Sequence, residues 1–270
     1  MLIGLAYALL WVALIIYLVY AFYGWRGSGW AATGVTLAAW ALLLQGLVSR
    51  GLLAGHWPLT NRYEFALCLT WASLSIYLLL EVSWRERLSG AFVLAVALFV
   101  ASYAVTRPES MKAVVPLLPA LRSAWLQVHV LTASVAYAAF GVAAGLGLAR
   151  LVAWRFAETL AGRLPAVEQL DRMMTRPVAL GFPWLTLSIL TGAIWAQSAW
   201  GRFWGWDPKE TWALVTWLCY LIVLHLRPLP RWRGHRMAVL LLLGFGVVMV
   251  TFIGVPWLVR LVRLESLHGF

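Results

Sequence analysis

Apolar runs of about 20 residues recur along this chain and are separated by short polar connections. A run of that length, coiled as an α-helix, crosses the ~30 Å hydrocarbon layer of a bilayer. Hydrophobic residues make up 63% of the chain and charged residues 11%. The sequence therefore predicts an all-α protein, a polytopic bundle of helices embedded in a membrane.

About eight runs are long enough to be predicted as transmembrane helices. They cover residues 2–23, 30–49, 65–81, 90–106, 124–150, 178–198, 208–226 and 237–256. The first run has no basic lead-in and no small-residue cleavage pattern, so we interpret it as a retained helix rather than a signal peptide. No connection is long enough for a second folded domain, which predicts a single transmembrane domain over residues 1–270.

Basic residues in the connections predict the orientation of the bundle. The formal net charge is +11, and residues 154–177 and 227–236 are rich in arginine. By the positive-inside rule both segments are expected to be cytoplasmic, the first as a cytoplasmic loop. Alternation then places both termini on the outer, periplasmic side, with 12 of the 21 Lys and Arg residues inside. Because the charge is explained by topology, we expect no nucleic-acid binding.

The connection at residues 199–212 is unusually aromatic and is predicted to be an external loop. Membrane-interface anchoring explains one or two tryptophans in such a place, but not this cluster. Flat indole rings can stack on a porphyrin and exclude water from it, so the loop is predicted to be a haem platform. Its aromatic members are Trp200, Phe203, Trp204, Trp206 and Trp212.

The acidic residues of this loop have a structural interpretation. Asp207 is followed by Pro208 and, three residues after Asp207, by Glu210. Asp at the N-cap, Pro at the first helical position and Glu three residues after the cap are typical of a helix start. We therefore expect Asp207 and Glu210 to fix the loop's geometry and not to act as catalytic groups.

Ionisable side chains inside membrane helices are functional candidates, and two histidines qualify. His129 is expected about 8 Å below the outer end of its helix, and His225 about 27 Å deeper than Asp207, at 1.5 Å per residue. The two residues therefore cannot share one iron. His268 returns to the outer side after the last span, where it can approach His129. From position alone, His225 also fits a polar helix end.

Other candidate residues are predicted to have smaller roles. His56 and Trp57 lie in an outer loop, where they are expected to contact the outer site without binding iron. Cys68 and Cys219 each stand alone inside a predicted helix, so neither forms a CxxC pair or a CxxCH attachment site. Any thiol chemistry must then use the cysteines of another protein.

Several segments resemble a known family. The stretch at residues 200–217, with its Trp-Asp-Pro-Lys-Glu-Thr-Trp-Ala core, resembles the signature of the CcsA-type (ResC-type) haem-handling subunit of the system II cytochrome c synthase, a member of the tryptophan-rich (WWD) proteins. Residues 55–64 resemble that family's first outer-loop motif, and residues 125–137 its helix before the inner loop. His268 fits the family's outer histidine near the C-terminus.

The resemblance implies a function in cytochrome c biogenesis at the cytoplasmic (inner) membrane. It implies that haem b, as a substrate in transit, is ligated at an outer site by His129 and His268, and at an inner site by His225 with a histidine of a CcsB-type (ResB-type) subunit. The outer site would meet the CxxCH segment of an apocytochrome c, kept reduced by thiol-reducing proteins on the outer side. Any enzymatic activity, as a holocytochrome c synthase, would be by positioning.

Three other classes stay open from the sequence. A CcmC-type protein would deliver haem to a chaperone and form no thioether bond. A b-type electron-transfer protein would need two histidines at one depth, which His129 and His225 do not provide. A haem-free solute transporter would leave the tryptophan density unexplained.

Overall fold

The computed structural model describes residues 1–114, 117, 121–156 and 167–262. Every regular element among them is helical, and these residues contain no strand, which confirms the all-α prediction. The helices are α1 (Leu2–Tyr23), α2 (Arg26–Ala54), α3 (Arg62–Trp84), α4 (Gly90–Val105), α5 (Glu109–Lys112), α6 (Ala124–Arg155), α7 (Val167–Trp200), α8 (Pro208–Leu226), α9 (His235–Met249) and α10 (Val255–Val262).

Six helical segments are long and apolar enough to cross a membrane, which supports a multi-pass membrane protein. They are Leu2–Tyr23, Gly27–Ala54, Arg62–Trp84, Ala124–Arg155, Val167–Trp200 and His235–Val259. Helix α4 is apolar but has only 16 residues. Helix α8 has 19 residues and begins with a charged turn. A total of eight spans therefore stays a prediction, as does the side on which each terminus lies.

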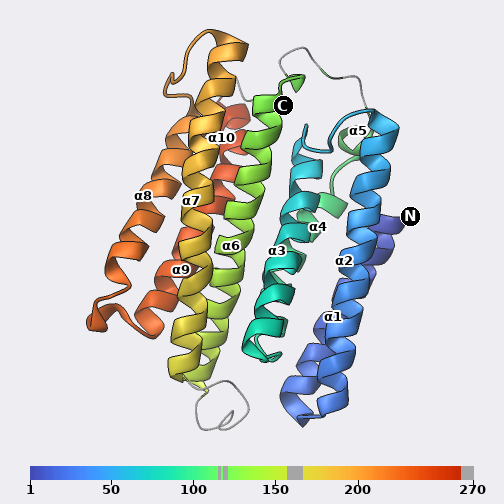
Figure 1. Cartoon of the computed structure of the whole chain (residues 1–270), viewed down its shortest axis with the longest axis vertical. Helices are drawn as coiled ribbons and strands as arrows, with labels where there is room; N and C mark the ends of the chain where they lie inside the picture. The colour runs from blue at the N-terminus through green and yellow to red at the C-terminus, as the bar shows by residue number, and fades with distance from the viewer. Residues whose placement is uncertain (115–116, 118–120, 157–166, 263–270) are drawn as a thin grey trace.

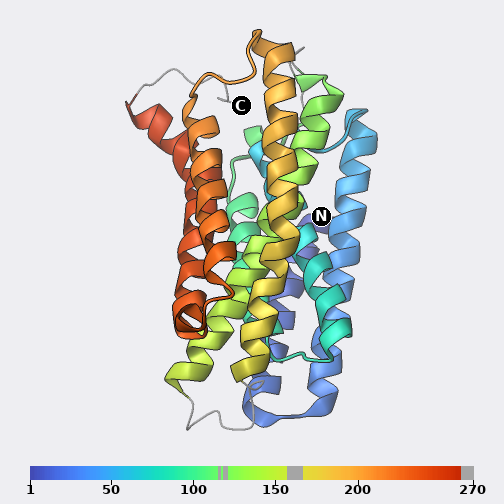
Figure 2. The ribbon, with the colours of Figure 1, turned by 60° about the vertical axis from the view of Figure 1, so that its left-hand side comes forward.

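Helix α6 forms the centre of the bundle (Figure 1) and packs against α3, α4, α7 and α9. Its small residues allow close approach, as is typical where helices pack in a membrane. A Cβ added at Gly145 would lie only 2.7 Å from the Val93 Cα of α4. Helices α1 and α2 pair with each other and lie on the far side of α3 and α4 from α7–α9 (Figures 1 and 2).

A buried carboxylate connects the N-terminal helices. Glu81 of α3 is 4% exposed and accepts hydrogen bonds from Tyr17 of α1 (2.9 Å) and Thr33 of α2 (2.6 Å). The Arg87 guanidinium lies 3.2 Å from the same carboxylate. Because a charge in an apolar setting is stable only when it is paired, this network fixes α1 and α2 against α3.

The largest departures from the sequence-based helix boundaries are in α7 and in the last span. Helix α7 begins at Val167, and Pro177 and Pro183 lie inside it, so residues 167–177 of the expected loop 154–177 are helical. Tertiary packing against α6 outweighs the local preference of proline to end a helix. The last span contains a π-helical turn, Val250–Gly254, between α9 and α10. Pro256 has no N–H to donate and its ring would clash with the carbonyl four residues earlier, which accounts for the widened turn.

Candidate functional site

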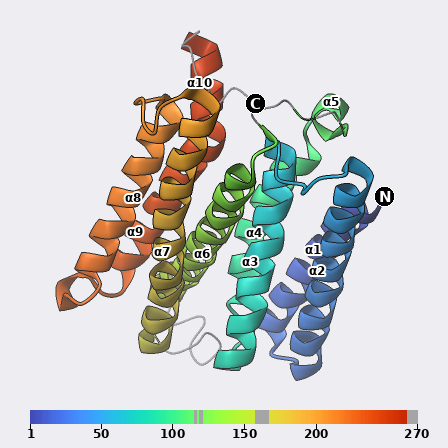
Figure 3. The same cartoon turned by 45° about the horizontal axis from the view of Figure 1, so that its top comes forward.

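A pocket lies at one end of the bundle. We call this end the loop end and define it by connections 55–61 and 201–207, which lie at the same end of the ribbon (Figure 3). The pocket lies between the entry to α3, helices α6, α7 and α8 and the π-helical turn. The empty space at this site, together with the part that is open to the surroundings, is about 1200 Å³. Its walls are mainly apolar and aromatic. The polar or charged side chains on these walls include Arg62, His129, Ser188, Lys209 and Glu210.

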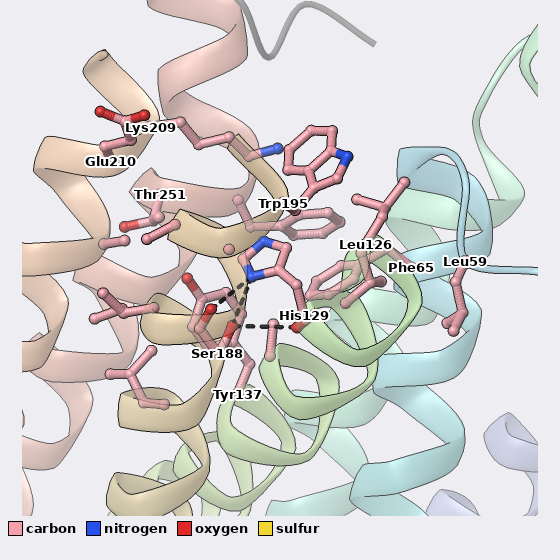
Figure 4. A pocket seen from close by; sticks show the side chains of 18 of the residues that line it. Leu59, Phe65, Leu126, His129, Tyr137, Ser188, Trp195, Lys209, Glu210 and Thr251 are labelled. Atoms are coloured by element: carbon pink, nitrogen blue, oxygen red, sulfur yellow. Dashed lines mark hydrogen bonds between the residues drawn. The ribbon is translucent and has the colours of Figure 1, made fainter. Parts of the chain in front are cut away.

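His129 of α6 projects into this pocket and is oriented by α7 (Figure 4). Its Nδ1 lies 2.7 Å from the Ser188 carbonyl oxygen, and the Ser188 hydroxyl donates to the His129 carbonyl at 3.2 Å. A carbonyl can only accept, so Nδ1 carries the proton and Nε2 keeps the lone pair that can bind a metal. Metal-ligating histidines are usually held by a hydrogen bond of this kind.

The space for the imidazole depends on a glycine. A Cβ at Gly192 of α7 would lie 2.7 Å from His129 Nδ1 and 2.9 Å from His129 Cε1. The absence of a side chain at position 192 therefore lets the ring lie directly against α7. On the same helix, Trp195 is 3% exposed and nearly parallel to the imidazole, at 14° and 6.4 Å between ring centroids.

The tryptophan-rich loop contributes part of the pocket wall. Phe203 and Trp204 line the pocket, while Trp200 packs edge-on against Trp195 at 4.8 Å between ring centroids. Trp206 contacts Trp204 at 5.7 Å between ring centroids and is 67% exposed. The predicted aromatic platform is therefore divided between residues in the pocket and residues beside it.

A capping box fixes this loop where α8 begins. The Asp207 carboxylate accepts from the Lys209 N–H at 2.9 Å, and Glu210 Oε2 accepts from the Gly205 and Asp207 N–H groups at 2.8 and 3.1 Å. The structure thus contains the helix start expected from the sequence. Between the two N–H groups, Trp206 adopts a left-handed backbone with φ of 57°, which strains a bulky residue. Glu210 stabilises this conformation.

The π-helical turn forms the wall opposite the α6 side. Thr251 and Phe252, both in this turn, line the pocket, and Thr251 shares a hydrogen bond of 2.9 Å with Thr216 of α8. Turns of this kind often occur at functional sites because they redirect side chains within a helix. Here the turn is joined to α8 by the hydrogen bond between Thr251 and Thr216.

Several other predicted residues lie away from the pocket. His225 is exposed in the last turn of α8, and its Nδ1 lies 2.8 Å from the carbonyl oxygen of Leu221 in its own helix. His56 Nδ1 contacts the Trp57 carbonyl at 2.9 Å, and neither residue lines the pocket, although the adjacent residues 59–62 do. His268 lies outside the described residues. Trp212, in the first turns of α8, also does not line the pocket.

Sequence reasoning missed several residues that shape this site. Ser188, Gly192 and Trp195 all lie in α7 and are brought to His129 by helix packing. Lys209 belongs to the tryptophan motif, yet its side chain received no role in the sequence-based interpretation. A lysine next to a cluster of indoles is the one signal that pointed to it from sequence.

These features define a class: a multi-pass helical membrane protein with a histidine in an aromatic pocket at one end. Residues 59–262 match the family described as "Cytochrome C assembly protein". The chain belongs to this family, and to its CcsA-type branch, and it functions in cytochrome c biogenesis.

Three relatives described as "Cytochrome c biogenesis protein CcsA" illustrate the similarity. The chain is 34% identical to the protein of Pyropia yezoensis, over 95% of this chain and 94% of the relative. It is 36% identical to that of Guillardia theta, over 83% and 82% of the two chains. It is 37% identical to that of Parasynechococcus marenigrum, over 86% of each.

Proposed function

We propose that this chain binds haem at the loop-end pocket and presents it for thioether attachment to the CxxCH segment of an apocytochrome c. The observation that carries the proposal is His129, whose Nδ1 is engaged by Ser188 and whose ring lies inside an aromatic pocket. An imidazole held in this way is an axial ligand of the type found in haem proteins. The Cytochrome C assembly family supports the biological context.

The residues of the pocket fit the chemistry of haem. Apolar and aromatic walls suit the porphyrin faces, while a few polar groups can orient its edges. Groups of His, Cys, Asp or Glu that could hold a separate metal ion do not occur among the described residues. We propose His268 as the second outer ligand, which would make the iron bis-imidazole.

The attachment reaction needs positioning more than acid–base chemistry. Each cysteine thiol adds across one vinyl group, so that S–C and C–H bonds form while the S–H bond and the C=C π bond are lost. The atoms and electrons balance without an external oxidant, provided that the thiols arrive reduced. Holding the vinyl groups close to the thiols lowers the barrier by proximity. We propose that thiol-reducing proteins on the outer side supply the reduced cysteines.

A partner subunit completes the proposed system. His225 lies about 24 Å along α8 from Lys209, at 1.5 Å per residue, so it belongs to a different site. We propose that a CcsB-type subunit supplies the second ligand of this inner haem site, and that haem moves from there to the outer pocket. In this arrangement the bundle lies in the cytoplasmic membrane with the loop end facing outward.

Absorption spectra of the chain purified with a CcsB-type partner, together with maturation of a CxxCH reporter, test this proposal. Wild type is expected to show a Soret band that His129→Ala weakens or shifts and that added imidazole restores. A matched control is His235→Ala, because that imidazole stacks on Trp154 at 4.7 Å away from the pocket. Wild type without haem under haem-replete expression, or an unchanged spectrum in His129→Ala, would contradict the proposal.

A further inference from the structure

The charged side chain of Lys209 in the aromatic pocket has no assigned role. The sequence contains 21 Lys and Arg residues, of which only Lys112 and Lys209 are lysines. Lys112 pairs with Glu109 at 2.9 Å outside the pocket. Lys209 is half-buried and its side chain points into the pocket, toward the region of Trp195 and His129 (Figure 4).

The ammonium of Lys209 lacks a protein partner in the part of the chain that the structure describes. Its backbone N–H donates to Asp207, but the ammonium donates no hydrogen bond and forms no ion pair within 4.0 Å among these residues. The neighbouring Glu210 carboxylate accepts two backbone N–H groups of the loop on one oxygen. Its other oxygen has no hydrogen-bond partner among the described residues, and no ion pair within 4.0 Å joins it to Lys209. A positive charge therefore faces an apolar pocket without a counter-charge in contact with it.

The surroundings make this arrangement costly unless an anion binds there. Lys209 lies in the first turn of α8, where the helix dipole disfavours a cation. Arg62, from the start of α3, lines the same pocket and repels the ammonium, and the attraction of the nearby Asp207 carboxylate offsets this repulsion only in part. Burial against aromatic walls adds to the cost by removing water from the charge. A carboxylate ligand would offset all three effects.

We propose that Lys209 binds a propionate carboxylate of the haem and thereby sets the rotation of the macrocycle about the iron–His129 axis. This inference rests on the proposed function. Haem carries both of its carboxylates on one edge and its vinyl groups elsewhere on the ring. An iron–imidazole bond leaves the ring free to rotate in its plane, whereas a second, peripheral contact fixes which edge faces outward. Lys209 is thus a positioning residue that directs the vinyl groups toward the incoming thiols.

Titrations of haem and of haem dimethyl ester, whose carboxylates are uncharged, test this contact in the detergent-purified complex with the partner subunit. Wild type is expected to bind haem about tenfold to a hundredfold more tightly than the ester, the range of one charge-assisted hydrogen bond. Lys209→Met should remove this preference without shifting the Soret maximum of the saturated protein, because Lys209 is not an iron ligand. Lys209→Arg should retain most of it. The matched control is Lys112→Met, which should behave as wild type.

Amine labelling gives a readout that does not depend on affinity. With two lysines in the chain, an amine-reactive acetylating reagent and mass spectrometry can follow each one separately. Haem is expected to protect Lys209 at least about tenfold more than its dimethyl ester does, while Lys112 reacts equally in every sample.

The possible outcomes distinguish a failure of the proposed contact between Lys209 and a propionate from a failure of the proposed haem site. If wild type binds neither compound, the proposed haem site and the role of Lys209 fail together. If haem and its ester bind equally tightly and protect Lys209 equally, haem binding stands and the propionate contact is refuted. A Soret shift in Lys209→Met at saturation would also refute it, by making Lys209 an iron ligand.

Discussion

His129 lies near the start of α6, at the loop end of the bundle, and His225 lies in the last turn of α8, at the opposite end. The two rings are held in different ways. The His129 ring is held from a neighbouring helix, with Nδ1 2.7 Å from the Ser188 carbonyl of α7, and it lies inside a pocket. The His225 ring contacts only the Leu221 carbonyl of its own helix, at 2.8 Å among the described contacts, and is exposed. One histidine is therefore enclosed by this chain, and the other is presented at its surface.

The difference bears on the proposal that this chain contributes to two haem sites. A ligand fixed by packing and a second hydrogen bond is preorganised, and its site needs little from another protein. An exposed histidine at a helix end is not enclosed by the described residues, as expected for the proposed site that a partner completes. This contrast favours an outer site built largely by this chain and an inner site completed by a partner.

The strongest test of the comparison removes the enclosed imidazole. His129→Ala is expected to weaken haem binding at the loop end by more than about 100-fold, because loss of a supporting group alone typically costs 10–100-fold. The measurement is a haem titration followed by absorbance, with and without added imidazole. Equal affinity in His129→Ala and wild type would show that the pocket does not depend on this ligand.

A smaller effect is expected from filling the space beside the ring. The Cβ of Gly192→Ala would meet His129 Nδ1 at 2.7 Å and displace the imidazole from Ser188, so haem affinity should fall by about 10–100-fold. The matched control is Gly246→Ala in α9, where an added Cβ meets no atom within 4 Å. If both variants bind haem as wild type does, close contact with α7 is not what orients His129.

The capping box at the start of α8 allows a test of how much the loop beside the His129 pocket contributes to the stability of the protein. Asp207→Ala removes the cap of α8 and is expected to lower the free energy of unfolding by about 0.5–2 kcal/mol. Thermal unfolding followed by tryptophan fluorescence in detergent measures this change. Glu109→Ala serves as control, because Glu109 is 89% exposed and such surface pairs contribute about 0–1 kcal/mol. Equal melting temperatures for the two variants would contradict a structural role of the cap.

The smallest effect is expected at the exposed histidine of the isolated chain. His225→Ala should leave haem affinity at the loop end and thermal stability unchanged, because the ring contacts only its own helix among the described residues. When the CcsB-type partner is present, the same substitution should remove the haem bound at the inner site. The amount of haem per complex, measured by the pyridine haemochrome assay, distinguishes the two conditions. An equal loss with and without the partner would remove the proposed contrast between the two ends.

Local signals in the sequence predicted much of this architecture. The apolar runs gave the bounds of α1 and α8 to the residue, and the order of Asp207, Pro208 and Glu210 predicted the capping box. Helix α7 was predicted too short because the arginine-rich residues before position 178 were assigned to a cytoplasmic loop, whereas packing on α6 maintains the helix.

The residues that surround His129 could not be predicted from local sequence patterns. Its identity as a candidate followed from a histidine in an apolar run, but its partners did not. Ser188 is 59 residues away along the chain, and its contact depends on the register in which α6 and α7 pack. No local pattern encodes that register. The same holds for Gly192 and Trp195, which look like ordinary residues of an apolar helix.

The π-helical turn at Val250–Gly254 makes chain length at this point as important as residue type. Each added or removed residue rotates everything that follows by about 100° around the helix axis, since a turn has 3.6 residues. Adding or deleting one residue in the α-helical segments on either side of the turn would change which face α10 presents to the bundle, even if every remaining side chain were kept. Evolution can therefore exchange side chains in this segment more readily than it can change the number of residues in the helices that flank the turn.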